Sequence, residues 1–542
     1  MNKEVSISPE GIEYALPGKE DYAAEYGRVR ELAAAAKVNG QEIVVVLGLG
    51  FVGAVMAAIV ADSVDERGKP SKFVIGKQRP SVRSFWKIPM LNKGISPVKA
   101  EDPEVETLIR RCVLEKKTLT ATFTDDVLSL ADVVIVDIQL DYIKNDLGNV
   151  RSGHVEMSDM EESFDIIARH INPETLVLIE TTVAPGTTEQ IAFPLMKKIF
   201  RKRGIGSDPL LAHSYERVMP GRNYVASVRD FWRVCSGVNE KATQRVVKFL
   251  NEVLNTKEYP LTVLDRPIES ETAKIVENSY RATTLAFMDE WSKFAERNGI
   301  DIVKVINAVK VRPTHSNLIF PGPGIGGYCL PKDGGLGIWA YRHVLGFEDE
   351  LFKITPMAID INDTRALHAA QFVRDALRNM NLPIAGAEIL ILGASYREDV
   401  GDTRFSGSEL MVRRLTDMGA EIRVHDPYVD QWWELLKQDS YPRHSLKSFF
   451  RNQKKLKDLK VHKDLSEAMS GVDALVFAVR HKVYLDLEPE EVLRKVGGPV
   501  AVIDCFGVLD DRKIKRYLQL GCEVKGLGRG HIRRIKEEIR KE

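Results

Sequence analysis

The stretch from Pro321 to Asp333, PGPGIGGYCLPKD, combines several glycines with one cysteine, a lysine and an aspartate. Glycines let a backbone approach a ligand closely, and a cation next to a thiol favours the nucleophilic thiolate. A tight loop around a buried, inert cysteine fits the same residues equally well, because lone cysteines usually pack in cores. Cys329 is therefore a candidate nucleophile whose role depends on the rest of the chain.

A second group of polar residues lies on a long helix that the sequence predicts from Ile268 to Asn298. Lys274 and Asn278 are four residues apart, so they share one face of that helix. A lysine and an asparagine on a buried face could stabilise an oxyanion, whereas on an exposed face they would form a solvated stripe. Both interpretations stay open at this point.

The turn GLGFVG, residues 48–53, follows the apolar segment 43–47 and precedes the small-residue segment 54–61. A strand, a glycine turn and a helix in this order are typical of a dinucleotide-binding unit, in which the helix N-terminus faces the diphosphate. The whole run 43–61 has almost the length of a membrane span, but its glycines divide it. We therefore expect a buried βα unit, with contacts to the cofactor from Gly48, Gly50, Phe51, Val52 and Gly53.

The next predicted strand, residues 72–75, ends in Gly76, Lys77, Gln78 and Arg79. Dinucleotide-binding folds usually place an acid here to bind the adenosine ribose. That acid is missing, and the cations could bind the 2′-phosphate of NADP or form a solvated strand end. We expect NAD as the cofactor, with NADP as the alternative.

Two further buried strands are predicted at 131–136 and 175–179, with a helix between them. The hydroxyl-rich segment 180–188 follows the second strand, and Glu216 lies near a later turn. Open α/β sheets bind ligands at the carboxyl ends of their strands, although hydroxyl groups there can also cap helices.

A second α/β unit begins after residue 382 with a predicted strand at 388–392. The following turn carries Arg397 and Arg404, which suit phosphate groups. Further strands are predicted at 421–427, 474–479 and 500–504. The expected fold is α/β, with two Rossmann-like doubly wound parallel sheets joined by a long central helix.

Composition narrows the class of partner. The 542 residues are 44% hydrophobic and 28% charged, and 77 Lys and Arg balance 77 Asp and Glu. No net charge attracts nucleic acid or an acidic membrane, so we expect a small-molecule substrate. The five cysteines lack the spacing of zinc sites or disulfide frameworks, which predicts no metal and a reducing, cytoplasmic location. The N-terminus does not have the form of a signal peptide.

Taken in order, the motifs GLGFVG, ETTVAPGTT, ERVMPG, AKIVENSYRA, PGPGIGGYCLPKD, ASYREDVGDTRFS and VHDPY resemble the UDP-glucose/GDP-mannose dehydrogenase family over roughly residues 42–510. The resemblance implies an N-terminal extension (1–40), an NAD-binding domain (41–264), a central helical dimerisation and catalytic region (265–380) and a UDP-sugar-binding domain (381–542). It also implies a homodimer or higher homo-oligomer.

The family resemblance implies a four-electron oxidation of a sugar C6 alcohol to a carboxylate, consuming two NAD, for polysaccharide precursor synthesis. The cysteine thiolate would trap the intermediate aldehyde as a thiohemiacetal, and water would release the acid from a thioester.

The same resemblance assigns roles to individual residues. Cys329 is the nucleophile, Lys274 and Asn278 stabilise oxyanions, Asp333 holds the hydrolytic water, and Thr182 and Glu216 order water and assist proton transfer. Residues expected at the cofactor are Gly48, Gly50, Phe51, Val52, Gly53, Lys77, Thr182, Lys332 and Arg404. Residues expected at the substrate are Glu216, Lys274, Asn278, Arg312, Gly322, Gly324, Gly326, Gly327, Arg397 and Arg404.

Two departures from the family pattern matter. Pro220 stands where members acting on UDP-glucose or GDP-mannose commonly carry a second acid, and the form ERVMPG is similar to the UDP-N-acetylhexosamine branch. The segment 137–142, DIQLDY, replaces a loop that usually bears threonine and proline. The first departure favours UDP-N-acetylglucosamine or UDP-N-acetylmannosamine as substrate, with UDP-glucose as the alternative.

Two other functions compete with this hypothesis. A two-electron hydroxyacid-type dehydrogenase would share the architecture but would need neither Cys329 nor a second nucleotide-binding domain. A catalytically silent nucleotide-sugar-binding protein would not need the set of Lys274, Asn278, Cys329 and Asp333.

Overall fold

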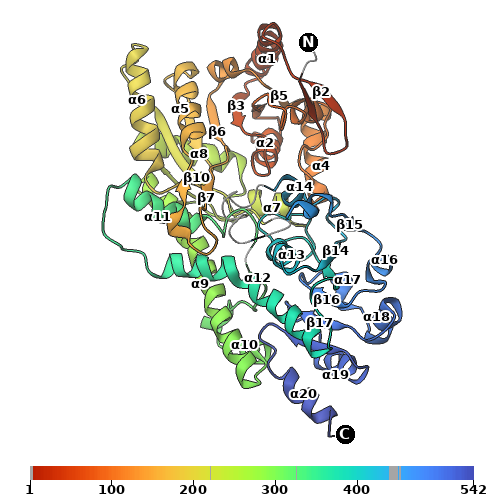
Figure 1. The fold of residues 1–542 in the computed structure, drawn as a ribbon. Coiled ribbons are helices and arrows are strands. Elements are labelled where there is room, and N and C mark those ends of the chain that lie inside the picture. The colour runs from red at the N-terminus through yellow and green to blue at the C-terminus, as the bar shows by residue number, and fades with distance from the viewer. Residues whose placement is uncertain (1–3, 220, 325, 439–449, 451–452, 542) are drawn as a thin grey trace. The chain divides into compact units, whose positions relative to one another are not determined.

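A computed structural model describes residues 4–219, 221–324, 326–438, 450 and 453–541. The chain forms two compact units (Figure 1). Unit 1 comprises Met1–Asp141, Val155–Ile275 and Trp339–Phe347, and unit 2 comprises Tyr142–His154, Val276–Ile338 and Glu348–Glu542. The long helix α9 (Pro267–Asn298) begins in unit 1 and ends in unit 2. The four-part division expected from the sequence stays a prediction.

Unit 1 contains an eight-stranded sheet in the order β12-β11-β10-β9-β6-β3-β4-β5. Its first six strands along the chain are parallel, and only β11 pairs antiparallel to β10. The strands are β3 (Glu42–Leu47), β4 (Lys72–Lys77), β5 (Leu119–Thr122), β6 (Val133–Val136), β9 (Leu176–Ile179), β10 (Leu210–Tyr215), β11 (Val234–Gly237) and β12 (Thr262–Val263). The helices are α1 (Asp21–Val38), α2 (Gly53–Asp62), α3 (Lys87–Asn92), α4 (Pro103–Arg110), α5 (Ser158–His170), α6 (Phe193–Lys202), α7 (Tyr224–Arg229) and α8 (Glu240–Val253).

Residues 43–61 form β3 and α2 and are not one continuous helix. The positive φ of Gly48, 99°, breaks the run, as the glycines predict. In the described residues no helix is both long and apolar enough to span a bilayer.

Unit 2 contains a six-stranded parallel sheet in the order β15-β14-β13-β16-β17-β18. The strands are β13 (Glu388–Leu392), β14 (Glu421–His425), β15 (Val461–His462), β16 (Ala474–Phe477), β17 (Ala501–Asp504) and β18 (Glu523–Gly526). The helices are α10 (Ile302–Lys310), α11 (Asp333–His343, which continues into unit 1), α12 (Ile354–Asn379), α13 (Gly407–Asp417), α14 (Trp433–Lys437), α16 (Leu465–Met469), α17 (Lys482–Leu485), α18 (Pro489–Val496), α19 (Asp511–Gln519) and α20 (Ile532–Ile539).

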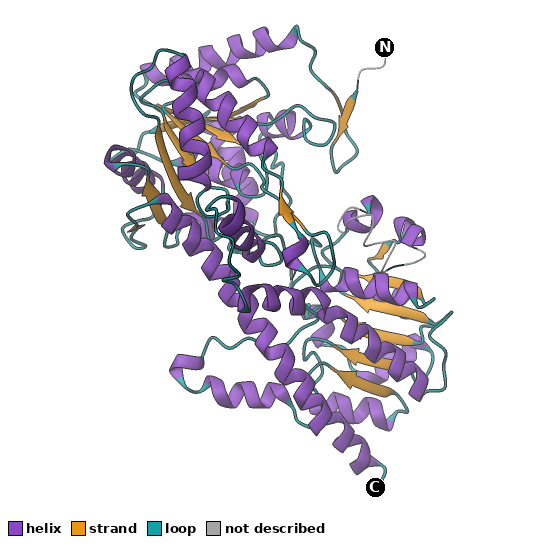
Figure 2. Ribbon diagram, turned by 60° about the vertical axis from the view of Figure 1, so that its left-hand side comes forward, coloured by secondary structure: helices purple, strands orange, loops and turns teal. Residues whose placement is uncertain are grey.

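Alternating side chains of β13 build two separate cores on the two faces of this sheet. Ile389 and Ile391 belong to the core shared with α12 and α13, whereas Leu390 and Leu392 belong to the core shared with α18 and α19. A strand covered on both faces must be apolar throughout, which explains the run ILIL in the sequence. Figure 2 shows helices on both faces of each large sheet. The expected pair of doubly wound α/β sheets with a long central helix is confirmed.

One element was not expected from the sequence. Residues 4–16 form an antiparallel hairpin of β1 (Val5–Ile7) and β2 (Glu13–Ala15), which precedes the helix α1. A further short pair, β7 (Tyr142–Ile143) and β8 (His154–Val155), lies later in the chain.

Candidate active site

In unit 1 the parallel strands bring several predicted residues to one edge of the sheet. The glycine turn follows β3, Thr182 comes shortly after β9, and Glu216 directly follows β10. Because β3, β6, β9 and β10 are parallel neighbours, their carboxyl ends lie along the same edge. This edge is where an open α/β sheet binds its ligand.

The glycine turn has the geometry of a dinucleotide cradle. A Cβ at Gly53 would lie 2.0 Å from the carbonyl oxygen of Gly48, so this glycine permits close packing of α2. A Cβ at Gly50 would meet nothing within 4 Å, which leaves open space against the backbone. Phe51 stacks on Tyr224 with ring centroids 4.7 Å apart, and Val52 immediately precedes α2. The turn therefore fits a dinucleotide diphosphate at the N-terminus of α2.

Gln78 and Lys87, which both follow β4, hold this turn. The sequence did not single them out as site residues. The backbone N–H of Leu49 donates to Oε1 of Gln78 at 2.8 Å. Nζ of Lys87 donates to the carbonyl oxygen of Leu49 at 3.1 Å, and burial lowers the pKa of Lys87. Only the folded chain shows these contacts, because the partners are 29 and 38 residues apart.

The two cations considered for a 2′-phosphate already have acidic partners. Lys77 forms an ion pair with Asp125, and Arg79 forms ion pairs with Asp159 and Glu162 at 3.4 and 3.1 Å. These carboxylates offset the positive charges that a 2′-phosphate would need. The strand end therefore fits NAD better than NADP.

Lys274 and Glu216 meet at the end of β10. Nζ of Lys274 donates to the carbonyl oxygen of Glu216 at 2.7 Å and lies 3.9 Å from its carboxylate. The ammonium also lies 5.3 Å from the centre of the Tyr215 ring, and both charged residues are buried. Lys274 is thus a buried cation, not part of a solvated stripe.

The segment 137–142, which differs from the family pattern, places the carboxyl group of Asp137 near the glycine turn. Asp137 follows β6, and its Cβ would lie 3.0 Å from a Cβ at Gly53. Burial raises the pKa of Asp137 well above its usual range, and the neighbouring charge of Glu180 adds to the effect. Glu180 in turn forms a buried ion pair with Arg233.

In unit 2 the residues around Cys329 form a hydrogen-bonded cluster. Nδ2 of Asn278 donates to Asp333 Oδ2 at 2.6 Å, and Nζ of Lys332 donates to Asp333 Oδ1 at 2.7 Å. Asn278, Lys332 and Asp333 are all buried. The backbone N–H groups of Lys332 and Asp333 both donate to the carbonyl oxygen of Cys329, which places the thiol residue just before α11. A position at a helix N-terminus favours a thiolate.

Cys329 differs from the other cysteines of the chain. All five are free, and of the five only Cys329 is not buried. Burial raises the pKa of Cys112 to about 12 and that of Cys235 to about 11, and it raises the pKa of Cys505 and Cys522 as well. The structure therefore identifies four buried cysteines and one partly exposed cysteine, Cys329.

The glycine loop before Cys329 packs against the arginine turn of the same unit. A Cβ at Gly326 would lie 2.4 Å from the Cβ of Tyr396, and one at Gly322 would lie 2.6 Å from the ring of Phe506. Gly324 and Gly327 have φ angles of 123° and 81°, which other residues rarely adopt. These glycines are needed for packing and backbone conformation, while their contact with a substrate stays a prediction. Residue 325 lies outside the described residues.

The three predicted arginines have different surroundings. Arg404 is held by Asp402, with Nη2 and Oδ2 2.6 Å apart, and its guanidinium lies 5.4 Å from the centre of the Tyr328 ring. Lys332 lies 4.7 Å from the same ring centre, so Tyr328 connects the two cations. Arg397 lies on the same turn as Arg404 and is partly exposed. Arg312 is exposed after α10, and its side chain makes no ion pair with another described residue.

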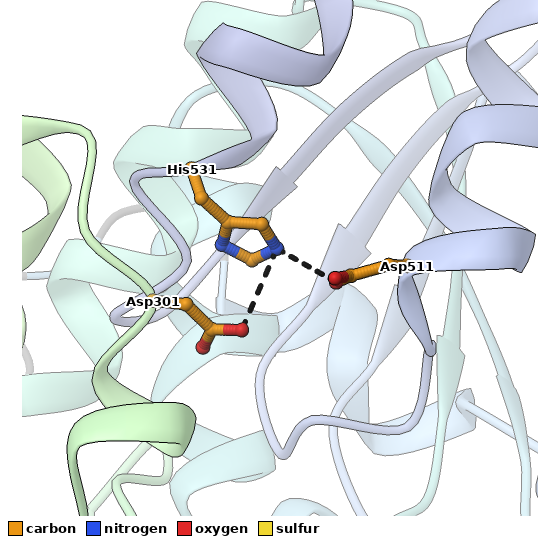
Figure 3. A group of neighbouring side chains, drawn as sticks. All are labelled: Asp301, Asp511 and His531. Atoms are coloured by element: carbon orange, nitrogen blue, oxygen red, sulfur yellow. Dashed lines mark hydrogen bonds and ion pairs between the residues drawn. The ribbon is translucent and has the colours of Figure 1, made fainter.

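A separate cluster in unit 2 joins Asp301, Asp511 and His531 (Figure 3). His531 Nε2 lies 2.9 Å from Asp511 Oδ1 and 3.6 Å from Asp301 Oδ2. Arg529 and Lys304 add two positive charges to these carboxylates, with Lys304 Nζ 2.5 Å from Asp511. Because the acids are already neutralised, we interpret the group as an ion-pair network that fastens the C-terminal segment to the start of α10.

Comparison with known proteins agrees with these features. Residues 42–255, 268–364 and 390–511 match the NAD-binding, central and UDP-binding domains of the UDP-glucose/GDP-mannose dehydrogenase family. A UDP-N-acetyl-D-mannosamine dehydrogenase of Pyrococcus horikoshii is 26% identical over 489 residues, which cover 90% of this chain and 100% of that protein.

Solved structures give the same result. The structure of an NDP-N-acetyl-D-galactosaminuronic acid dehydrogenase from Methanosarcina mazei Go1 has a TM-score of 0.71 at 27% identity, covering 93% of this chain and 98% of that one. The structure of the UDP-D-ManNAc dehydrogenase from Pyrococcus horikoshii has a TM-score of 0.72 at 25% identity, covering 90% of this chain and 100% of that one.

Proposed function

The chain belongs to the UDP-glucose/GDP-mannose dehydrogenase family, it is a nucleotide-sugar dehydrogenase, and its cofactor is NAD. We propose that it oxidises the C6 alcohol of a UDP-N-acetylhexosamine to a carboxylate through a covalent intermediate on Cys329. The observation that carries this proposal is the buried cluster of Asn278, Asp333 and Lys332 next to the partly exposed Cys329.

In the proposed reaction the glycine turn of unit 1 would hold NAD, which would supply the hydride acceptor for each of two oxidations, so two NAD would be consumed for each sugar. Cys329 adds as thiolate to the C6 aldehyde and forms a thiohemiacetal, which the second oxidation converts to a thioester. Water then adds to the thioester carbonyl and the C–S bond breaks. Cys329 leaves as the thiolate, and the sugar is released as the carboxylate. The covalent bond prevents escape of the aldehyde between the two oxidations.

The side chains on α9 have the properties this chemistry needs. Lys274 carries a buried positive charge and Asn278 has buried amide hydrogens, and both suit an oxyanion that develops at C6. Asp333 is held by two donors, so its carboxylate is fixed and can hold the hydrolytic water. Glu216 and Thr182 are proposed to order water and to assist proton transfer.

The cofactor contacts follow from the cradle in unit 1. The turn of Gly48, Gly50 and Gly53 is proposed to hold the NAD diphosphate at the N-terminus of α2. Lys87 adds a positive charge beside the turn, and among the described residues no carboxylate forms an ion pair with it. A diphosphate would supply the missing anion.

The proposed substrate is UDP-N-acetylmannosamine or UDP-N-acetylglucosamine, supported by the relatives named as UDP-N-acetyl-D-mannosamine dehydrogenases and by the motif ERVMPG. Pro220, the residue that motivates this choice, lies outside the described residues. The UDP-binding domain carries the arginine turn with Arg397 and Arg404, which we propose binds the substrate phosphates. UDP-glucose is the alternative substrate.

We also propose a homodimer built on α9. Exposed apolar side chains repeat along one face of this helix in unit 2, and Trp291 lies 5.5 Å from Phe294 between ring centroids. The exposed residues are Val276, Tyr280, Phe287, Trp291 and Phe294. An apolar stripe of this kind is typical of an interface. The five free cysteines support a reducing compartment, and we propose the cytoplasm.

Stoichiometry tests the reaction. Purified protein is incubated with UDP-N-acetylmannosamine, UDP-N-acetylglucosamine, UDP-glucose or GDP-mannose, each with NAD or NADP, and reduced cofactor is counted per sugar consumed. Two per sugar with a UDP-N-acetylhexosamine supports the proposal. One per sugar would contradict the four-electron reaction, and none with any pair would favour a binding protein.

The thiol is tested separately. Cys329→Ser should lower turnover by about 10³-fold or more while UDP-sugar binding changes little, because the nucleophile acts in the chemical step. Cys522→Ser, at a buried thiol in the same unit, is the matched control and should retain turnover in the folded fraction. Near-normal turnover of Cys329→Ser would exclude the covalent route.

A further inference from the structure

The N-terminal hairpin, residues 4–16, lies outside the part of the chain that matches the family, which begins at residue 42. A two-stranded hairpin is at best marginally stable by itself, so its order here depends on what it contacts. Its principal polar contact is made by Ser6, which is fully buried although the hairpin is at the protein surface. A buried hydroxyl must be satisfied by hydrogen bonds, and those of Ser6 define what the hairpin holds.

Ser6 bonds to the segment between Gln78 and Lys87. Its hydroxyl donates to the carbonyl oxygen of Val82 at 2.8 Å and accepts from the backbone N–H of Trp86 at 3.2 Å. A second contact comes from Tyr14 on β2, whose ring centre lies 5.6 Å from Nζ of Lys93, just after α3. The hairpin therefore contacts the segment after β4 at two separated points.

That segment also has contacts of its own with the domain. Phe85 packs on the core of unit 1, with its ring 5.9 Å from that of Phe123. Within the segment, Ser84 Oγ donates to the carbonyl oxygen of Arg79 at 2.9 Å. The bonds of Ser6 fix the stretch 82–86 that leads directly into Lys87.

The residues at the two ends of this segment, Gln78 and Lys87, form hydrogen bonds with the glycine turn. Gln78 accepts from the N–H of Leu49, and Lys87 donates to the carbonyl oxygen of the same residue. Leu49 is the second residue of the turn and precedes Gly50, the glycine with open space beside it. A continuous series of contacts thus runs from Ser6 through residues 82–87 to the cradle.

We propose that the N-terminal hairpin is a working part of the NAD site, and that Ser6 is a positioning residue that keeps Gln78 and Lys87 on the glycine turn. The hairpin touches no proposed catalytic residue among those described, so it acts through this segment alone. NAD binding and hairpin order are then coupled, and each stabilises the other. The inference rests on NAD binding by unit 1 and not on which nucleotide sugar is oxidised.

Ser6→Ala tests the coupling, with NAD and UDP as separate calorimetric probes on the full-length protein. The loss of two hydrogen bonds at one buried hydroxyl should weaken NAD binding about three- to tenfold and leave UDP binding unchanged. Thr107→Ala is the control, because the exposed Thr107 hydroxyl donates to the carbonyl oxygen of Pro103 within α4 of the same unit, outside both the hairpin and the segment 78–87. It should leave NAD binding as in the wild type.

Hydrogen exchange of the wild type gives a second measurement that does not depend on a variant folding. Amides of residues 4–16 should exchange several-fold more slowly when NAD saturates the protein, and UDP should have no such effect. Equal NAD affinity of folded Ser6→Ala and wild type, or unchanged exchange with NAD, would overturn the proposal. A wild type that binds UDP but not NAD would instead contradict the proposed function itself.

Discussion

The two sheets of this protein begin with the same arrangement but stabilise their first turn differently. In each unit a glycine with positive φ follows the strand of the large sheet that comes first along the chain: Gly48 follows β3 and Gly393 follows β13. A polar side chain after the next strand along the chain forms a hydrogen bond with that turn. In unit 1 that side chain is Gln78, which accepts one N–H. In unit 2 it is Asp426, which accepts the N–H groups of Ala394 and Ser395 at 2.8 and 3.1 Å.

The difference shows how one topology can serve two purposes. Asp426 is fully buried, and it also accepts from the backbone of Tyr428 and bonds to His481 at 3.1 Å. These donors lower the pKa of its carboxyl group, although burial alone would raise it. Asp426 therefore accepts hydrogen bonds from the protein itself and is not an acid that binds a ribose hydroxyl. The turn of unit 1 is held more lightly, and its open space at Gly50 stays available to a cofactor.

The largest effect on stability should come from replacing Asp426, which makes more hydrogen bonds to its turn than Gln78 does. Asp426→Ala leaves several buried donors without an acceptor, so we expect a loss of about 3–5 kcal/mol in the free energy of unfolding of unit 2. UDP binding should fall with it, while NAD binding should remain. Urea unfolding and calorimetry measure both.

Asp464→Ala provides the control for that experiment. Asp464 accepts from the N–H groups of Ser466 and Glu467 at the exposed start of α16, so its loss should lower the free energy of unfolding much less than the loss of Asp426. Equal losses in the two variants would show that Asp426 does not support unit 2 as the structure indicates.

A buried histidine in each unit extends the comparison to pH. His213 in unit 1 bonds to Ser270 Oγ at 2.7 Å, whereas His481 in unit 2 lies between Asp426 and Asp399. Burial, and then the charge of Lys274, lowers the pKa of His213 to about 3. The unfolded chain therefore binds a proton near pH 6.5 that the folded chain excludes until about pH 3.

It follows that His213 destabilises unit 1 as the pH falls below about 6.5. Between pH 6 and 4, His213 should lower the free energy of unfolding of unit 1 by about 1.4 kcal/mol for each unit by which the pH falls. His213→Gln should lose this slope, whatever its stability at neutral pH. Urea titrations of both proteins at pH 6.5, 5.5 and 4.5 measure it, and parallel pH profiles would contradict the prediction.

Local sequence patterns predicted the elements well because the strands and helices that build both sheets have strong apolar signatures. The run at 43–61 and the helix at 268–298 are examples, and both occur as expected. The family motifs also led to Cys329, which is the one cysteine of the five that is not buried. The hairpin was missed because its strands have three residues each and carry no clear alternation.

Contacts between distant residues explain the rest. Asn278 and Asp333 are 55 residues apart, and nothing in either motif indicates that they bond to each other. A Cβ at Gly322 would lie 2.6 Å from the ring of Phe506, so this glycine has a packing role, while its expected contact with the substrate stays a prediction. Glycine in a sequence signals a close approach without telling which group approaches, so packing and ligand contact cannot be separated at that level.

The smallest effect, and the sharpest test of the comparison, concerns Gln78. The N–H of Leu49 is a donor, so the atom of Gln78 that faces it must be the amide oxygen. Gln78→Ala removes this acceptor and should weaken NAD binding about fivefold, equivalent to ~1 kcal/mol. Gln78→Glu keeps an oxygen at the same place and adds the charge that Asp426 carries in unit 2. It should hold the turn and bind NAD at least as tightly as the wild type, while NADP binding weakens because the carboxylate repels a 2′-phosphate. Calorimetry with both cofactors distinguishes these outcomes. If Gln78→Glu loses affinity for NAD as Gln78→Ala does, an acceptor at this position is not what holds the cradle.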